Sequence, residues 1–186
     1  MGDTTAPTTA QELATSTTLR PLRRSDAASL TRLWDRNNAN LGTLLPGVGH
    51  EPPSETALRR HCENLELARA EDRRYAFGIW ADSELLGTLS LSNVIRGPLL
   101  SATLGLWLDR QARGRGVGKR AICLACRTAF EELGLHRLEA GVQPTNLASL
   151  GALRANGFTD IGLAHNYLLI GGRWTDHLLL ERIDGS

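Results

Sequence analysis

Glycine alternates with other residues in the stretch Arg113-Gly-Arg-Gly-Val-Gly-Lys119, which follows the apolar run Leu104–Leu108 and leads into a helix-like segment. Alternating glycines allow a sharp turn in which several backbone N–H groups converge. The positive end of the following helix dipole lies at the same point. The combination predicts a strand, a loop and a helix that together bind a phosphate group.

The spacing of the glycines separates three phosphate-binding designs. A P-loop requires Ser or Thr after its lysine to hold magnesium, but the residue at that position is Arg120. A dinucleotide fingerprint requires Gly-x-Gly-x-x-Gly, whereas Gly114, Gly116 and Gly118 alternate strictly. What remains is Arg-x-x-Gly-x-Gly, beginning at Arg113. A plain turn is the alternative interpretation, because 19 of the 186 residues are glycine.

The segments around this loop follow an order that resembles the GNAT superfamily of acetyltransferases, from about Thr18 to the C-terminus. The loop itself is similar to the one that holds the pyrophosphate of coenzyme A (CoA) in that superfamily. Leu104–Asp109 resembles the fourth strand, and Arg137–Asn146 resembles the fifth strand and its exit. Asn146–Phe158 resembles the Asn-x-x-Ser to Gly-Phe signature of the next helix. The resemblance implies one α/β (α+β) domain, with a mixed, mostly antiparallel sheet of about seven strands and about four helices.

Two further segments, Leu91–Gly97 and Asn166–His177, resemble the ribosomal-protein-alanine N-acetyltransferases, the RimJ/RimL-like branch. This resemblance implies an enzyme that transfers acetyl from acetyl-CoA to a protein N-terminus, by direct attack in a ternary complex. The implied acceptor is the α-amino group of an N-terminal alanine of a ribosomal protein. Two alternatives remain: acetylation of a small-molecule amine, such as an antibiotic or a polyamine, and CoA binding without catalysis.

Length and composition fit one domain. The 186 residues carry a net charge of +1, which argues against broad electrostatic contact with DNA or a membrane. Three cysteines and a sequence without a signal-like apolar segment indicate a reducing, cytoplasmic setting. No metal is expected, and a homodimer is left open. Residues 1–17, rich in Thr, Ser and Ala, are expected to form a flexible tail before an acetyltransferase domain at 18–186.

Hydrophobic periodicity and turn residues predict the order of the elements. The expected helices cover about 26–37, 54–70, 116–133 and 149–156. The expected strands cover about 18–22, 75–80, 85–94, 100–108, 137–142, 158–170 and 174–181.

The resemblance assigns the cofactor site to three parts of the chain. In the superfamily, the fourth strand lies along the pantetheine arm and offers a backbone amide to the thioester carbonyl. The glycine loop holds the pyrophosphate, and an asparagine after the fifth strand meets the pantetheine amides. The implied cofactor-binding residues are Leu106, Trp107, Leu108, Arg113, Gly114, Arg115, Gly116, Val117, Gly118, Lys119, Asn146 and Ser149. Helix capping is the alternative role for the last two.

Two residues are candidates for catalytic proton transfer. Ser149 takes the position near the thiol where some related enzymes place a serine, and Leu153 stands where other branches place a tyrosine acid. Thr103 stands where some relatives carry a glutamate base. Glu139, on the expected fifth strand, could accept a proton through water, or it could form a structural salt bridge.

Three residues are expected to contact the acceptor. Trp34 and Asn37 lie at the end of the first expected helix, beside a loop at 41–53 that forms one wall of the acceptor site in the superfamily. Tyr167 lies in the terminal hairpin, where the resemblance to the branch is dense. Core packing is the alternative for the tryptophan, and hydrogen bonding within the hairpin is the alternative for the tyrosine.

Overall fold

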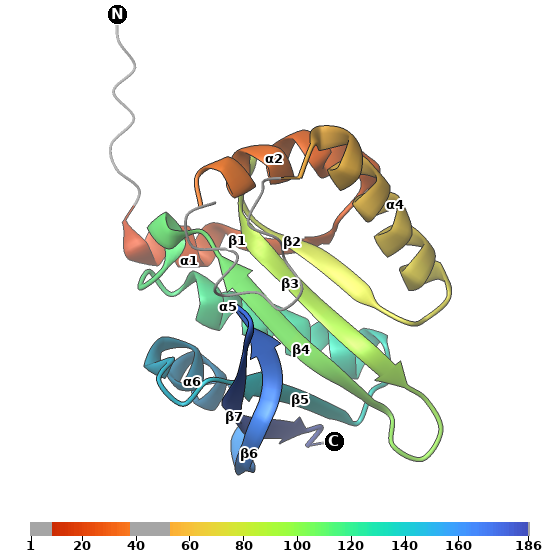
Figure 1. Cartoon of the computed structure of the whole chain (residues 1–186), viewed down its shortest axis with the longest axis vertical. Coiled ribbons are helices and arrows are strands. Elements are labelled where there is room, and N and C mark those ends of the chain that lie inside the picture. The colour runs from red at the N-terminus through yellow and green to blue at the C-terminus, as the bar shows by residue number, and fades with distance from the viewer. Residues whose placement is uncertain (1–8, 38–52, 186) are drawn as a thin grey trace, which may run out of the picture.

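Seven strands form one sheet in the order β1-β2-β3-β4-β5-β7-β6 (Figure 1). The computed structural model describes residues 9–37 and 53–185. The strands are β1 Thr17–Pro21, β2 Tyr75–Ala81, β3 Glu84–Ile95, β4 Ser101–Leu108, β5 Arg137–Val142, β6 Thr159–Ile170 and β7 Arg173–Ile183. Among these strands, β4 and β5 pair in parallel and the other neighbours pair antiparallel. The mixed, mostly antiparallel sheet expected from the sequence is confirmed.

Helices cover both faces of the sheet. They are α1 Ala10–Ser16, α2 Ala27–Asp35, α4 Glu55–Ala70, α5 Val117–Arg127 and α6 Leu147–Arg154, with short turns η1 Arg24–Asp26, η2 Arg110–Ala112 and η3 Thr128–Glu132. One buried cluster joins α2 and α4 to the sheet, and a larger one joins α5 to the opposite face. We name these the α2–α4 face and the α5 face. No helix in the described part of the chain is long and apolar enough to cross a membrane.

Helix α1 corrects the expectation of a flexible tail for the part of residues 1–17 that the structure describes. Ala10–Ser16 are helical, and Leu13 is buried in the cluster of the α5 face. The helix begins with a capping box, in which the Thr9 hydroxyl accepts from the N–H of Glu12 and the Glu12 carboxylate accepts from the N–H of Thr9. A single buried leucine produces no periodic pattern, so the sequence did not reveal this helix.

Two expectations fall partly outside the described residues. These are the tail over residues 1–8 and the acceptor loop over residues 41–52. The flanking elements follow the sequence closely. Ser54, for example, caps α4 by accepting from the N–H of Ala57 at 3.2 Å.

The parallel seam between β4 and β5 is short. It covers three residue pairs, from Ser101 with Arg137 to Thr103 with Glu139. Beyond the seam, β4 continues along β3 while β5 continues along β7. The sheet therefore consists of two antiparallel parts, and their central strands separate toward their carboxyl ends. We name this separation the divergence of β4 and β5.

A polar cluster holds the opposite end of the sheet together. Arg96 donates to both carboxylate oxygens of Asp72, at 2.6 and 2.7 Å, and to Leu133 O at 2.6 Å. The hydroxyl of Tyr75 donates to Asp72 Oδ1 at 2.6 Å. The hydrogen bonds from Arg96, followed by that from Tyr75, lower the pKa of Asp72 to about 2.

Asp72 is expected to stabilise the fold above about pH 4 and to lose this effect in acid. Because an unfolded aspartate titrates near pH 3.9, the contribution disappears as the pH falls from about 4 to about 2. The side chain is 40% exposed, so Asp72→Asn should lower the free energy of unfolding at pH 7 by only about 1 kcal/mol. When urea unfolding is measured across this pH range, the free energy of unfolding of Asp72→Asn should also fall less steeply toward acid than that of the parent protein. Glu71→Gln, at an exposed neighbouring carboxylate, is the control; an unaltered decline in Asp72→Asn would contradict the assignment.

Candidate active site

The backbone of β4 offers polar groups to the divergence. Asp109 N–H donates to Leu86 O at 2.8 Å. In an antiparallel ladder every second residue bonds to the neighbouring strand, so Trp107 also bonds to β3. The N–H and C=O groups of Leu106 and Leu108 therefore point away from β3. On that side β5 has already moved away. An extended ligand with amide groups can pair with this edge as a further strand would.

Among the described residues, one face of the divergence is filled by side chains and the other is open. On the α5 face, Leu104 and Leu108 of β4 and Ala140 and Val142 of β5 are each less than 9% exposed. On the α2–α4 face, the corresponding positions include two glycines, Gly105 and Gly141, and both are exposed. A second substrate can therefore reach a group held in the divergence from the α2–α4 face.

The glycine loop leads into a helix without a side-chain cap. Gly114 and Gly116 have φ values of 71° and 81°, in the left-handed region that favours glycine. Gly116 is the N-cap of α5 and provides no side-chain hydrogen bond. The first N–H groups of α5, from Val117 to Lys119, have no acceptor within the helix. With the helix dipole they form a site for a phosphate group.

Close packing fixes this loop in place. A Cβ atom at Gly118 would lie 3.2 Å from Cδ1 of Leu108, and one at Gly116 would lie 3.2 Å from Cβ of Ala14 in α1. The loop is therefore held between the end of β4 and α1. Lys119 is exposed in the first turn of α5 and can add positive charge, while Arg115 is half-buried in the loop.

Arg113 holds the loop to the strand instead of reaching outward. Its guanidinium donates to Leu108 O from Nε at 3.1 Å and from Nη2 at 3.0 Å. Its backbone N–H donates to Arg110 O at 3.4 Å. Two nitrogens of the Arg113 guanidinium therefore have a structural role, and its phosphate contact stays a prediction.

Asn146 and Ser149 lie where the chain leaves β5. Asn146 Oδ1 accepts from the N–H of Ser149 at 3.1 Å and caps α6. The capping role that the sequence left open for Asn146 is therefore present, and it uses the amide oxygen. The side chain of Ser149 is partly exposed. Because β4 and β5 are parallel, the start of α6 lies at the same edge as the glycine loop.

Glu139 forms the salt bridge that was the alternative to a catalytic role. Arg137 Nε lies 2.7 Å from its Oε1, and the same arginine pairs with Glu181 on β7. The carboxylate belongs to the last residue pair of the seam, opposite Thr103. The position of Glu139 is thus explained by an ion-pair network, centred on Arg137, that links β5 to β7.

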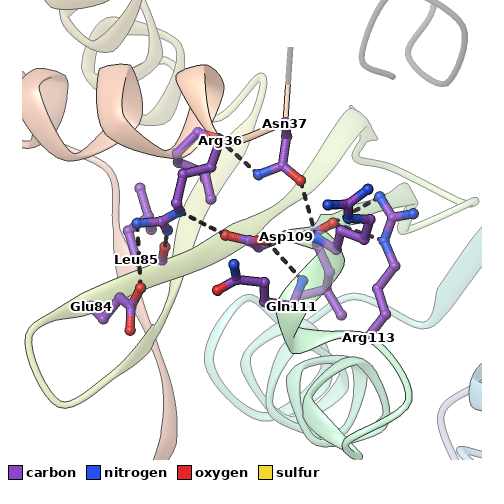
Figure 2. A network of polar contacts seen from close by, with 10 residues as sticks. Arg36, Asn37, Glu84, Leu85, Asp109, Gln111 and Arg113 are labelled. Atoms are coloured by element: carbon purple, nitrogen blue, oxygen red, sulfur yellow. Dashed lines mark hydrogen bonds and ion pairs between the residues drawn. The ribbon is translucent and has the colours of Figure 1, made fainter. Parts of the chain in front are cut away.

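The side chains of Trp34 and Asn37 make contacts within the fold. Trp34 packs against the cluster of the α2–α4 face, as its alternative interpretation holds. Asn37 is 6% exposed, its Nδ2 donates to Leu33 O at 2.9 Å, and its Oδ1 accepts from the N–H of Arg110 at 3.1 Å (Figure 2). Asn37 therefore has a structural role, and its contact with the acceptor stays a prediction. The sequence did not reveal that Asp109 and Arg36 belong to the same network, because these two residues pair with each other across 73 positions of the chain.

Tyr167 lies beside the divergence. A Cβ atom at Gly141 would be 3.3 Å from Tyr167 Cε1, so the ring covers the end of β5 beyond the seam. Tyr167 is 44% exposed, and its ring centre is 5.6 Å from that of the buried His177. His177 Nδ1 lies 3.1 Å from Thr175 O; since a carbonyl only accepts, this nitrogen carries a proton. The exposed tyrosine is thus placed where an acceptor could meet it.

Comparison with known proteins identifies the family. The acetyltransferase (GNAT) domain family matches residues 17–159. The chain belongs to the GNAT acetyltransferase family. "Probable N-acetyltransferase YjcK" of Bacillus subtilis (strain 168) is 44% identical over 164 residues, which are 87% of this chain and 91% of that protein.

Two solved structures extend this similarity to the ribosomal branch. Mycobacterium smegmatis RimJ, in complex with CoA-disulfide, matches with a TM-score of 0.85 and 32% identity, over 90% of this chain and 81% of that one. The ribosomal-protein-S5-alanine acetyltransferase from Vibrio fischeri matches with a TM-score of 0.86 and 28% identity, over 92% of this chain and 94% of that one. The resemblance seen in the sequence is confirmed at the level of fold and family.

A substitution in the loop tests its assignment to this GNAT site. Gly116→Glu should weaken CoA binding at least about tenfold, because a carboxylate would stand at the phosphate position before α5. Gly134→Glu is the matched control, since Gly134 also has a left-handed φ, 60°, but lies between η3 and β5. Titration calorimetry with CoA measures both affinities. Equal binding by the two variants would contradict the assignment.

Proposed function

We propose that this GNAT enzyme transfers the acetyl group of acetyl-CoA to the α-amino group of a protein N-terminus. The proposed acceptor is the N-terminal alanine of a ribosomal protein. Similarity to RimJ and to the S5-alanine acetyltransferase, over at least 90% of this chain, supports this acceptor class. The divergence of β4 and β5 beside the uncapped start of α5 is the observation that supports acetyl-CoA as the donor.

The residues around the divergence fit CoA in their chemistry. The first N–H groups of α5 would hold the pyrophosphate, and the exposed ammonium of Lys119 would add charge. The backbone of Leu106 and the N–H of Leu108 would bond the amides of the pantetheine arm as a neighbouring strand would, since Arg113 already holds the Leu108 carbonyl. Asn146 Nδ2, which the cap does not use, would donate to the same arm.

A backbone N–H of β4 would stabilise the reacting carbonyl. Negative charge develops on the thioester oxygen as the amine attacks, and a donor fixed in place stabilises that charge without rearranging. Leu106 provides such an N–H on the side of the divergence. The strand is rigid there because it remains paired with β3.

An α-amine needs little help to lose its proton. With a pKa near 7.8, roughly 14% of it is neutral at pH 7, against about 0.04% of a lysine amine near 10.4. These fractions correspond to penalties of about 1.1 and 4.6 kcal/mol. An α-amine acceptor therefore does not need a carboxylate base. This agrees with Thr103 at the position where some relatives carry a glutamate, and with the ion pair that Glu139 forms.

Ser149 is the proposed proton donor to the departing thiolate. The thiol of CoA should have a pKa close to the 8.5 or so of cysteine, so protonation assists its departure near neutral pH. Ser149 is partly exposed at the edge shared with the glycine loop. Leu153 leaves no tyrosine hydroxyl one turn further along α6.

Ser149→Ala should lower kcat by about 100-fold while the affinity for CoA changes less than about threefold. The substitution keeps the backbone N–H that Asn146 binds, so the cap of α6 and the stability of the fold should be preserved. Thr145→Ala, at an exposed hydroxyl four residues earlier, is the control. Turnover at saturating acetyl-CoA measures the effect, and a full kcat in Ser149→Ala would remove the proposed role.

Thiol release from acetyl-CoA tests the acceptor class directly. Peptides that begin with alanine, serine or methionine are compared with spermidine and an aminoglycoside. We expect release with the alanine peptide, and none with an N-terminally blocked copy of it. Release confined to the polyamine or the drug would assign the enzyme to small-molecule acetylation. Binding of CoA without release from any amine would instead favour a protein without catalysis.

A further inference from the structure

Two polar links join the end of α2 to the connection that follows β4 (Figure 2). Arg36 Nε donates to Asp109 Oδ2 at 3.0 Å, and Asn37 Oδ1 accepts from the N–H of Arg110 at 3.1 Å. We name these four residues the α2 clamp. It connects α2 to the segment that leads from β4 into the glycine loop.

Two of the four residues in the α2 clamp, Asn37 and Asp109, are buried and have defined partners. Asp109 is 3% exposed and Asn37 is 6% exposed. The second oxygen of Asp109 accepts from the N–H of Gln111 at 2.9 Å, and the amide nitrogen of Asn37 donates to Leu33 O at 2.9 Å. Buried charges and amides are stable only when such bonds are kept. The clamp therefore strongly favours one position of α2 against this connection.

Arg36 also holds α2 to the start of β3. Its Nη2 donates to Leu85 O at 3.2 Å, and its Nη1 lies 3.4 Å from Glu84 Oε1. One side chain thus contacts the start of β3 and, through Asp109, the residue after β4. Its partly exposed guanidinium lies across both strands, so α2 cannot shift along either one without breaking these bonds.

The clamp acts on the part of β4 that faces the divergence. Asp109 directly follows Leu108, whose carbonyl is held by Arg113 of the glycine loop. Helix α2 belongs to the layer over the α2–α4 face, which is the open side of the divergence, whereas α5 covers the opposite face. The clamp is therefore a polar link between the layer on the open side and the backbone that would hold the donor.

We propose that Arg36 and Asn37 are positioning residues for acetyl transfer. Through Asp109 and Arg110 they set the placement of the β4 backbone, and with it the thioester, relative to an acceptor that approaches from the α2–α4 face. This inference rests on the proposed function. It predicts an effect on kcat rather than on cofactor affinity, because the groups that bind CoA remain when the clamp is removed. A misplacement of about 1 Å can cost about 100-fold in rate.

Three variants separate positioning from stability. Arg36→Met combined with Asp109→Leu removes both charges of the ion pair, so the buried Asp109 carboxylate is not left without its partner. Arg36→Lys keeps a cation opposite Asp109. Asn37→Leu removes the acceptor for the N–H of Arg110, together with the donor to Leu33 O, so it breaks the second link at nearly the same side-chain size. Arg32→Gln, at an exposed arginine on the same helix, is the control.

Each variant is compared by kcat, by KM for acetyl-CoA and for the peptide, by CoA affinity in calorimetry, and by its thermal midpoint. Assays run well below the lowest midpoint. We expect the double variant and Asn37→Leu to lose at least about tenfold in kcat, with CoA affinity within about threefold of the parent. Arg36→Lys should recover most of the rate, and Arg32→Gln should match the parent.

An unchanged kcat in either clamp variant that folds would overturn the proposal, as would a loss in CoA affinity that accounts for the whole effect. The result is distinguishable from failure of the proposed function. If the parent enzyme acts on another amine and not on the alanine peptide, the acceptor assignment fails and the clamp is tested with that amine. If no amine reacts, the readout is amide hydrogen exchange at residues 104–112 with CoA bound. Faster exchange in the double variant than in the parent supports the clamp, and unaltered exchange overturns it.

Discussion

The three-residue seam between β4 and β5 is the constraint on which the rest of the structure depends. Each of these strands has a longer antiparallel partner on its other side, β3 for one and β7 for the other. Those partners keep both strands extended after the seam ends, so the backbone edge of β4 beyond it stays ordered without a neighbour. A site for an extended, amide-bearing molecule follows from the topology of the sheet before any side chain is considered.

The parallel direction of the two strands brings the remaining parts of the site to the same edge. The chain leaves β4 through Asp109 into the glycine loop and α5, and it leaves β5 through Asn146 into α6. Glycine is favoured at the start of α5 because Gly116 adopts a left-handed φ of 81°, and Gly118 leaves room for the side chain of Leu108. The buried clusters on the two faces then decide the direction of access, because the α5 face is filled by aliphatic side chains.

Much of this arrangement could be predicted from the sequence, and the failures share one cause. The strand, glycine loop and helix around Gly116 were predictable because their signals are local. The role of Asn146 as a cap was also within reach, since its partner is three residues away. The contacts of Asn37 and Arg113 with backbone groups of η2 and β4 were not predicted, because these contacts depend on the tertiary fold. Helix α1 was missed because Leu13 meets its partners through the tertiary fold alone.

A crystal structure of the enzyme with CoA would test this view of the site most directly. The pantetheine arm should lie between β4 and β5 with hydrogen bonds to the backbone of Leu106, and the pyrophosphate should lie within hydrogen-bond distance of the N–H groups at 117–119. The β4–β5 seam should still end at Thr103 and Glu139. CoA bound elsewhere, or a β4–β5 ladder continued to Leu108 with the ligand outside it, would contradict the assignment of the divergence as the cofactor site.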